Sequence, residues 1–500
     1  MTSPGYILAI DQGTTGTTAL LVDGGGKVIW QSYQEITQIY PQAGWVEHDP
    51  SEIFNSVIDT VDDLLDATEI SPRQLNSIGI TNQRETTIIW ERSTGKPVSN
   101  AIVWQCRRTA PLCDSLKARG LEAVVAGKTG LPIDAYFPAT KIRWILDNIP
   151  NGQLRAERGE LAFGTVDTWL LWNLTNGTVH ATDVSNASCS MLYNINTLEW
   201  DTDLLNELNI PATTLPSVLP SSTTYGYTGG NFFAGQAIPI ASMVGDQQAA
   251  LFGQACFKPG MSKNTYGTGS FILINTGPDR VRSEHGLMSI IAWDLGDGVT
   301  YGLEGSIFST GATVQWLRDG LQIIEESSDV EGLAASVEDN GGVYLVPAFT
   351  GLAAPHWDMY ARGTIVGITC GTERGHIARA ALESTAYQTR DAVDAMQSDT
   401  GLEIPLLRVD GGGTANDLMM QFQADILGIP IERHAIAETT ALGAAYLAGL
   451  ATGFWKDTDE IAANWESDRQ YIPSMGDSQR TRLYDDWQRA VGRSKNWQQS

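Results

Sequence analysis

Short apolar runs separated by polar, glycine-rich turns dominate the hydrophobic pattern of this chain, and they predict an α/β fold. Two of the turns are rich in glycine and threonine, at 11–17 and 264–270. They lie about half the chain apart, which suggests a duplicated αβ domain with one phosphate-facing turn from each half. Strand-like runs occur at 6–10, 18–22, 77–80, 86–90, 271–274 and 407–410.

A helix is predicted over 50–65. Asp49 is expected to be its N-cap, with Pro50 in the first turn and Glu52 completing a capping box. Its apolar residues fall on one face: Ile53, Val57, Val61, Leu64 and Leu65.

Two glycine-rich segments in the second half predict a nucleotide site and a close helix contact. The run 407–410 leads into the turn 411–413, and a helix with Leu418, Phe422 and Ile426 on one face follows. A strand, a glycine turn and a helix N-terminus together favour phosphate binding. The small-residue helix 441–449 allows close backbone packing, and we expect it where two domains meet.

The length of the chain requires more than one core. At 500 residues it exceeds the roughly 250 to 300 residues at which a single hydrophobic core stops growing. Two domains of similar size are therefore expected, 1–251 and 252–500.

Composition excludes several classes of partner. With 58 acidic and 32 basic side chains the formal net charge is −26, which repels nucleic acid and anionic membrane surfaces. The first residues have no basic and apolar leader, and no apolar run reaches the ~20 residues that span a bilayer. A cytoplasmic protein without membrane insertion is expected.

The cysteines and histidines show no metal-ligand spacing. An odd number of cysteines favours buried thiols in a reducing compartment over disulfides. The five are Cys106, Cys113, Cys189, Cys256 and Cys370.

The turns lack both the GxxxxGK[ST] and the GxGxxG patterns, so a P-loop or a Rossmann site is disfavoured. Two apposed Gly/Thr hairpin turns can instead surround a triphosphate with N–H and hydroxyl donors, while Asp11 orients a hydrated Mg²⁺. Either turn alone would be interpreted as an ordinary hairpin. Their presence in opposite halves favours the triphosphate.

Polar residues near the predicted strand ends have two interpretations each. Asp246 can be the N-cap of the helix that follows it or a general base for a substrate hydroxyl, and the two roles are not exclusive. Arg84 and Glu85 form either a surface ion pair or the donor and acceptor of a polyol site. The aromatic residues Trp104, Tyr136 and Phe271 belong either to the core or to an apolar wall against a carbon chain.

With these residues in view, the chain resembles the FGGY family of carbohydrate kinases, and within it the glycerol kinases. The resemblance extends from Tyr6 to about Trp455 and is carried, in the family's order, by the segments AIDQGTTG, AGWVEHDP, ITNQRETT, NAIVWQCRRTA, GTVDTWLLW, GDQQAALFGQ, KNTYGTGSF, VPAFTGLAAPHWD and VDGGGTAND. It implies two actin-like (ribonuclease H-like) domains that flank a deep cleft, with ATP held mainly by the second and the polyol mainly by the first.

The resemblance also implies the reaction and its residues. ATP and Mg²⁺ would phosphorylate glycerol to sn-glycerol 3-phosphate, with Asp246 as the general base and Asp11 near the metal. Thr18 stands where many members have an arginine that contacts the phosphates. The residues implied for glycerol are Arg84, Glu85, Trp104, Tyr136, Asp246, Gln247 and Phe271. Those implied for the nucleotide are Thr14, Thr15, Gly16, Thr268, Gly311, Gln315, Gly412 and Asn416.

Two other functions share part of this pattern. An actin-like ATPase that only switches shape explains the two turns but not the polyol-suited Arg84, Glu85 and Asp246. A sibling kinase for another polyol or a ketose is the second alternative. A homodimer or homotetramer is expected.

Regulation is expected to differ from that of some bacterial members, which fructose 1,6-bisphosphate inhibits at a Gly/Arg loop. The matching segment 225–237 contains no arginine, and no lysine or arginine occurs between Arg158 and Lys258. A bisphosphate needs charge-assisted donors. Insensitivity to this effector and to histidine phosphorylation is therefore expected.

Overall fold

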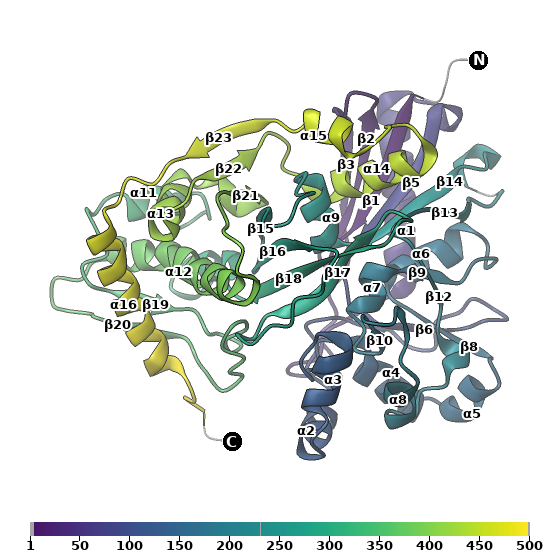
Figure 1. Ribbon diagram of the computed structural model, residues 1–500, viewed down its shortest axis with the longest axis horizontal. Coiled ribbons are helices and arrows are strands. Elements are labelled where there is room, and N and C mark those ends of the chain that lie inside the picture. The colour runs from purple at the N-terminus through teal and green to yellow at the C-terminus, as the bar shows by residue number, and fades with distance from the viewer. Residues whose placement is uncertain (1–4, 231, 499–500) are drawn as a thin grey trace.

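Two mixed β-sheets form the frame of the computed structural model, which describes residues 5–230 and 232–498 (Figure 1). The first sheet contains, in spatial order, β13 (Ser222–Tyr227), β14 (Pro239–Gly245), β5 (Leu75–Asn82), β1 (Tyr6–Gln12), β2 (Gly16–Asp23) and β3 (Val28–Glu35). The second contains β17 (Met288–Asp294), β18 (Val299–Ile307), β16 (Ser270–Gly277), β15 (Ser262–Tyr266), β21 (Leu407–Asp410), β22 (Ile431–His434) and β23 (Ser467–Tyr471).

The two sheets have the same strand order and the same strand directions. In the first, β1 pairs antiparallel with β2 and parallel with β5, and β5 continues parallel to β14. In the second, β15 pairs antiparallel with β16 and parallel with β21, and β21 continues parallel to β22. An antiparallel strand closes each parallel side, β13 in one and β23 in the other. The predicted duplication is therefore visible in the topology, with β17 as an added strand.

Helices cover the faces of both sheets. The longer ones are α1 (Pro50–Thr68), α4 (Pro138–Asn148), α6 (Val166–Leu174), α9 (Asp246–Gly253), α12 (Arg374–Thr400), α13 (Asp417–Leu427), α14 (Thr439–Thr452) and α16 (Asp477–Ser494). Residues 110–207 add further elements at the lower right of Figure 1, among them α2 (Ala110–Ala118), α3 (Glu122–Thr129), α5 (Gly152–Glu157), α7 (Val184–Ser188) and α8 (Thr202–Glu207).

The remaining elements are short. The helices are α10 (Gly311–Gln315), α11 (Asp329–Ala334) and α15 (Thr458–Ala463). The strands are β4 (Glu47–His48), β6 (Ile88–Glu91), β7 (Ala101–Ile102), β8 (Leu161–Gly164), β9 (Ala181–Asp183), β10 (Tyr193–Asn194), β11 (Glu199–Trp200), β12 (Ser217–Leu219), β19 (Tyr344–Val346) and β20 (Thr364–Val366).

Helix α14, from the second half of the sequence, packs against the strands of the first sheet (Figure 1). Its backbone carbonyls accept hydrogen bonds from that sheet: Ser242 Oγ donates to Ala444 O at 2.8 Å and Ser222 Oγ to Leu447 O at 2.8 Å. On another side it crosses α9, where a Cβ added at Gly443 would lie 1.9 Å from the carbonyl oxygen of Ala249. The small residues are needed because two backbones touch here.

Several local expectations differ from the structure. Helix α1 begins at Pro50 and Asp49 caps it, as expected, but it continues to Thr68. Glu52 does not complete a capping box; its carboxylate accepts hydrogen bonds from Thr37 N and Oγ1, both at 2.8 Å. The carboxylate of Glu52 is therefore hydrogen-bonded to a neighbouring segment and not to the backbone at the start of its own helix. The strand expected at 86–90 begins only at Ile88.

The cysteines are free, and four of the five are buried. The expectation of burial is wrong for Cys370, which is exposed. Within the described ranges, none of the helices combines the length and the apolar character of a bilayer span.

Replacing Gly443 with Ala should lower the free energy of unfolding by about 1 to 3 kcal/mol, because the new methyl group meets the Ala249 backbone and the helices must separate. Urea denaturation measures the change. Gly492 in α16 is the matched control, since a Cβ there has nothing within 4 Å. Gly492→Ala should leave stability unchanged or raise it by about 0.5 to 1 kcal/mol. Equal effects of the two substitutions would contradict the close contact.

Candidate functional site

The carboxyl ends of three parallel strands meet at one edge of the first sheet. Gln12 at the end of β1 pairs in register with Asn82 of β5, and Asn82 pairs with Gly245 of β14. In open α/β sheets ligands bind outside these ends. The residues that follow the three strands are therefore brought together from distant parts of the sequence.

Arg84 and Glu85 follow β5 and are buried, each 2% exposed. Their charged atoms lie 3.7 Å apart, Arg84 Nε to Glu85 Oε1. The surface ion pair is therefore the wrong interpretation of this sequence pair. Glu85 also has a φ of 58°, a left-handed conformation that costs a non-glycine residue of order 1 to 3 kcal/mol and that is concentrated at functional sites.

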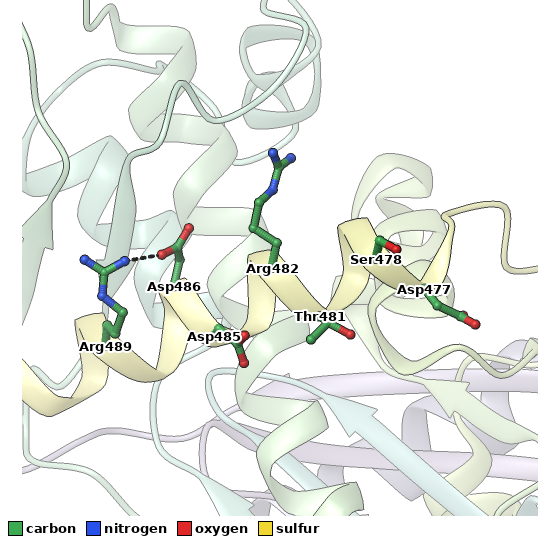
Figure 2. Close-up of a pocket in the computed structure, with 7 residues that line it drawn as sticks. All are labelled: Asp477, Ser478, Thr481, Arg482, Asp485, Asp486 and Arg489. Atoms are coloured by element: carbon green, nitrogen blue, oxygen red, sulfur yellow. Dashed lines mark hydrogen bonds and ion pairs between the residues drawn. The ribbon is translucent and has the colours of Figure 1, made fainter.

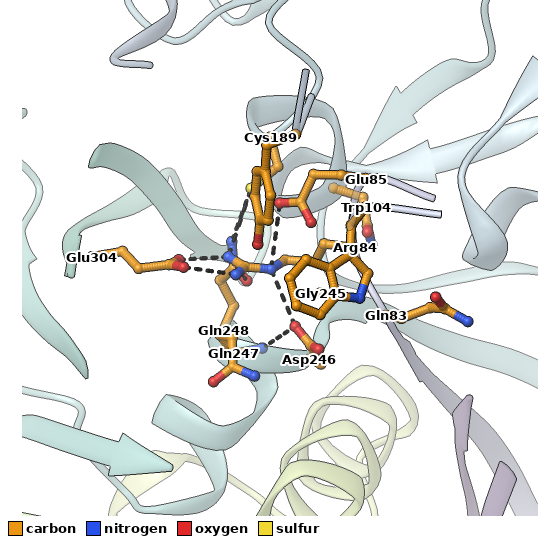
Figure 3. Close-up of polar contacts among 12 residues, drawn as sticks. Gln83, Arg84, Glu85, Trp104, Cys189, Gly245, Asp246, Gln247, Gln248 and Glu304 are labelled. Atoms are coloured by element: carbon orange, nitrogen blue, oxygen red, sulfur yellow. Dashed lines mark hydrogen bonds and ion pairs between the residues drawn. The ribbon is translucent and has the colours of Figure 1, made fainter. Parts of the chain in front are cut away.

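Asp246 is the first residue of α9, and it contacts the same arginine. Arg84 Nε lies 3.1 Å from Asp246 Oδ1 (Figure 3). The N-cap of α9 is Gly245 and no side chain caps it, so the N-cap interpretation of Asp246 is wrong. The carboxylate accepts a hydrogen bond from Gln247 N at 2.7 Å and stays partly exposed, at 26%. An accessible acid at a helix start suits proton transfer.

Three aromatic side chains stand beside these polar groups. The ring of Trp104 lies 5.6 Å from that of Tyr136 and 6.3 Å from that of Phe271, edge to face in both cases. Tyr136 is buried, whereas Trp104 and Phe271 are half-buried. The structure thus brings the three together as a partly open apolar surface, and neither Trp104 nor Phe271 is a fully enclosed core residue.

Burial perturbs the acids of this cluster. Desolvation raises the pKa of Glu85 to about 8, although Arg84 opposes the shift. Burial likewise raises the pKa of Asp246, again against the effect of Arg84. Asp11, at the end of β1, has its pKa raised well above the usual value by burial and by the nearby charges of Asp246 and Glu438. Acids that share a cleft and resist ionisation are typical of functional sites.

The two Gly/Thr turns are tight β-hairpin turns. Gly13 N donates to Gly16 O at 2.9 Å between β1 and β2, and Gly267 N donates to Gly269 O at 2.8 Å between β15 and β16. The second turn is also hydrogen-bonded to the first residue of α10, since Gly311 N donates to Gly267 O at 3.1 Å. Gly16 has a packing reason of its own, since a Cβ there would lie 2.4 Å from Gln34 O of β3.

Trp104 links the apolar surface to the first turn. Its indole Nε1 donates to Thr14 Oγ1 at 2.8 Å. Since its ring also faces Phe271, which follows the second turn, Trp104 lies between the two turns.

A cavity of about 540 Å³ opens beside the second turn. Five of the residues expected to bind nucleotide line it: Thr268, Gly311, Gln315, Gly412 and Asn416. Other lining residues belong to the two predicted glycine turns, among them Gly267 and Gly413. The apolar lining was not expected from the sequence, and it includes Val314, Val330, Leu382 and Met419. This mixture of apolar side chains with a few polar groups is typical of a small-molecule site. Thr14, Thr15 and Gly16 do not line this cavity; they belong to the first turn, where Thr14 contacts Trp104.

Comparison with known proteins identifies the family. The model of the FGGY family of carbohydrate kinases, N-terminal domain, matches residues 6–253, and that of its C-terminal domain matches residues 262–452. The chain belongs to the FGGY family of carbohydrate kinases.

Individual relatives of this FGGY kinase cover almost its whole length. Glycerol kinase 2 of Thermotoga maritima is 59% identical over 493 residues, 99% of each chain. Glycerol kinase of Carboxydothermus hydrogenoformans is 58% identical over 493 residues, 99% of each chain. The crystal structure of Plasmodium falciparum glycerol kinase with ADP superimposes with a TM-score of 0.91 at 38% identity, covering 98% of each chain.

The fold itself is shared more widely. Xylulose kinase from Lactobacillus acidophilus matches with a TM-score of 0.86 at 23% identity, covering 98% of this chain and 96% of that one. A likeness at this level of identity concerns the architecture, the two-domain α/β fold with a mixed sheet in each domain.

Sequence reasoning missed three buried charged residues of this FGGY kinase. Lys141 Nζ donates to the backbone oxygens of Glu85 at 3.1 Å and Tyr136 at 2.6 Å. Lys263 Nζ donates to Gln247 Oε1 at 2.5 Å. The third, Glu304, binds Arg84. Their neighbours in the sequence are a mixture of polar, small and apolar residues, so no local pattern marks them as part of the site.

Burial lowers the pKa of both lysines, to about 7 for Lys141 and about 8 for Lys263. An amine with a pKa near 7 can stay neutral inside the protein and still donate hydrogen bonds. Both lysines therefore hold the backbone and an amide of the site through hydrogen bonds, and burial makes both easier to deprotonate than a solvated lysine.

A second hollow runs along the outer face of α16 (Figure 2). Its lining comes from this one helix and consists largely of charged side chains, including the ion pair of Arg489 Nη1 with Asp486 Oδ1 at 2.5 Å. Arg489 is 68% exposed, so the pair belongs to a solvated helix face. None of the expected site residues lies here.

Gly412→Leu should weaken nucleotide binding without unfolding the protein. Gly412 lines the cavity, and a Cβ built on it has nothing within 4 Å, so a larger side chain enters open space. We expect the dissociation constant for ATP to rise by about tenfold or more, measured by calorimetry, with an unchanged melting temperature. Gly412→Ala is the control and should have a smaller effect. Full ATP affinity of Gly412→Leu would contradict this use of the cavity.

Proposed function

We propose that this chain transfers the γ-phosphoryl group of ATP to glycerol and forms sn-glycerol 3-phosphate. The observation that carries the proposal is the cluster of the buried Arg84 and Glu85 with the partly exposed Asp246, which lies at the edge of the first sheet with an aromatic surface beside it. The relatives at 58–59% identity, which are named glycerol kinases, support the same substrate.

The polar groups match three neighbouring hydroxyls. Arg84 offers an N–H donor and Asp246 an acceptor on one side of the site. Burial raises the pKa of Glu85, which favours its protonated carboxyl group, and a protonated carboxyl can donate as well as accept. Trp104 and Phe271 provide apolar contact for the carbon chain, and Gln247 is held by Lys263.

Asp246 is the group best placed to take a proton from the attacking hydroxyl. Phosphoryl transfer depends mainly on in-line positioning and on charge stabilisation, so the base needs accessibility more than strength. Asp246 is partly exposed, whereas Glu85 is enclosed. The backbone N–H groups and hydroxyls of the two turns would hold the triphosphate, with the base of the nucleotide in the cavity beside Gly412.

The residues present fit a magnesium ion held partly through water. In the described residues, no three His, Cys, Asp or Glu side chains are grouped to hold a metal by themselves. The charge of Asp246 raises the pKa of Asp11, so a cation near both acids would relieve their repulsion. Few protein ligands, with water and phosphate completing the shell, is the arrangement that Mg²⁺ favours. When bound, Mg²⁺ would neutralise charge on the transferring phosphoryl group.

The remaining expectations stay part of this proposal. They are a division into domains at 251/252, a homodimer or homotetramer, a cytoplasmic location and insensitivity to fructose 1,6-bisphosphate. The segment 225–237 includes Asn231, which lies outside the described residues.

Asp246→Asn tests the proposal most directly. The amide keeps the shape of the side chain but cannot accept the proton, so kcat with glycerol should fall by about 10² to 10⁴ while ATP affinity changes little. A coupled assay with and without glycerol measures the turnover. An ATPase that only switches shape would hydrolyse ATP equally well without glycerol, and a kinase for another sugar would prefer another compound in a polyol panel. Either result contradicts the proposal.

The pH dependence has a definite sign. Asp246 must be ionised to act as a base, so kcat/KM should fall as the pH falls through its pKa. Because burial raises that pKa, the fall should begin at a higher pH than for a solvated aspartate of pKa ~3.9.

Trp104→Ala should raise the KM for glycerol and admit larger polyols, since it removes apolar contact and opens volume beside the substrate. Because one apolar side-chain contact is lost, we expect the KM for glycerol to increase by about tenfold. Trp104→Phe is the matched control, because it retains an aromatic face and should discriminate polyols nearly as well. Unaltered specificity of Trp104→Ala would assign this residue to packing alone.

A further inference from the structure

Glu304 is a carboxylate in the buried part of a strand. It lies on β18 of the second sheet and has no exposed surface. A buried carboxylate is costly unless it is paired and fully hydrogen-bonded. Its partner comes from the other half of the chain: Arg84 Nη1 donates to Oε2 at 2.5 Å and Nη2 to Oε1 at 2.7 Å (Figure 3).

This pairing occupies both terminal nitrogens of Arg84. Nη1 has a second acceptor, Gln248 Oε1, at 3.3 Å. The edge of the guanidinium that carries Nε is not used by Glu304. Its Nε lies 3.1 Å from Asp246 Oδ1 and 3.7 Å from Glu85 Oε1. Among the residues that the structure describes, this Nε–H has no hydrogen-bond acceptor of good geometry. A buried donor without an aligned partner is available to a ligand hydroxyl.

We infer that Glu304 is a positioning residue for polyol binding, which holds the fork of Arg84 so that only the Nε edge faces the substrate. This inference rests on the proposed function. Without Glu304, the two terminal nitrogens could turn to Asp246 and bind its carboxylate in a bidentate pair. The general base would then be held in an ion pair and would be a poorer proton acceptor.

The charges around Asp246 support the same assignment. The groups that face it are Arg84, Glu85, Glu304, Lys263 and Asp11. Arg84 lowers its pKa, whereas the charge of Glu304 raises it. Removing that charge should therefore lower the pKa of Asp246 and move the acidic limb of kcat/KM to lower pH.

Glu304→Gln tests the inference in the full-length protein. The amide retains the volume but cannot hold the guanidinium as an ionic fork. We expect the KM for glycerol to rise by about 10- to 100-fold, the value of a charge-assisted hydrogen bond, with the KM for ATP unchanged. The acidic limb of the pH profile should move to lower pH at the same time.

Glu383→Gln is the matched control. Glu383 of α12 is also buried, and it accepts from Arg379 Nε at 2.9 Å and Asn340 Nδ2 at 2.8 Å, neither of them an expected site residue. Its loss should lower the melting temperature and leave both KM and the pH limb unchanged. A purely structural role for Glu304 predicts the same behaviour for the two variants.

Glu304→Asp provides a second test in case Glu304→Gln does not fold. Aspartate keeps the charge but is one methylene shorter, so the pH limb should stay near that of the wild type while the KM for glycerol rises. Wild-type KM in a folded Glu304→Gln or in Glu304→Asp overturns the inference alone. A wild-type protein without glycerol-dependent turnover overturns the proposed function, and the inference with it.

Discussion

The structure depends on the contact of two helix backbones at α9 and α14. A glycine makes this contact possible, because a Cβ at Gly253 of α9 would lie 2.0 Å from Thr439 O of α14. The strand β5 approaches the same helix as closely, since a Cβ at Gly79 would lie 2.3 Å from Ala444 O. Since α14 comes late in the sequence and β5 and α9 come earlier, the packing of α14 against both elements joins the two halves of the chain. The buried core is continuous across them, with Leu20 and Leu273 in one cluster.

Because the two halves are fixed in this way, a charge on one can be satisfied by the other. Arg84 follows a strand of the first sheet and Glu304 lies inside a strand of the second, yet both are buried and in contact. Such a pair is stable only if the geometry is maintained, because separating it would leave two uncompensated charges in a low-dielectric interior. The close contact of the helices thus supports the electrostatics of the site, because it keeps the strands that carry Arg84 and Glu304 together.

Local signals in the sequence predicted a large part of this arrangement. The two hairpin turns, the strand before Gly411 and the cap at Asp49 all depend on residues close in sequence, and each is present. Predictions that required knowledge of distant partners were wrong more often. Glu52 binds Thr37 instead of its own helix, and Asp246 contacts Arg84 instead of capping α9. The position of Glu304 could not be predicted, because its partner lies 220 residues away.

The equal strand order of the two sheets means that the same hairpin turn occurs twice in different surroundings. Each turn joins the two antiparallel strands at the matching place in its sheet, β1 to β2 and β15 to β16. Thr14 of the first turn accepts a hydrogen bond from Trp104, whereas Gly267 of the second lines the cavity beside α10. Equivalent substitutions in the two turns should therefore have unequal effects, because an identical backbone shape meets an aromatic ring on one side and an open cavity on the other.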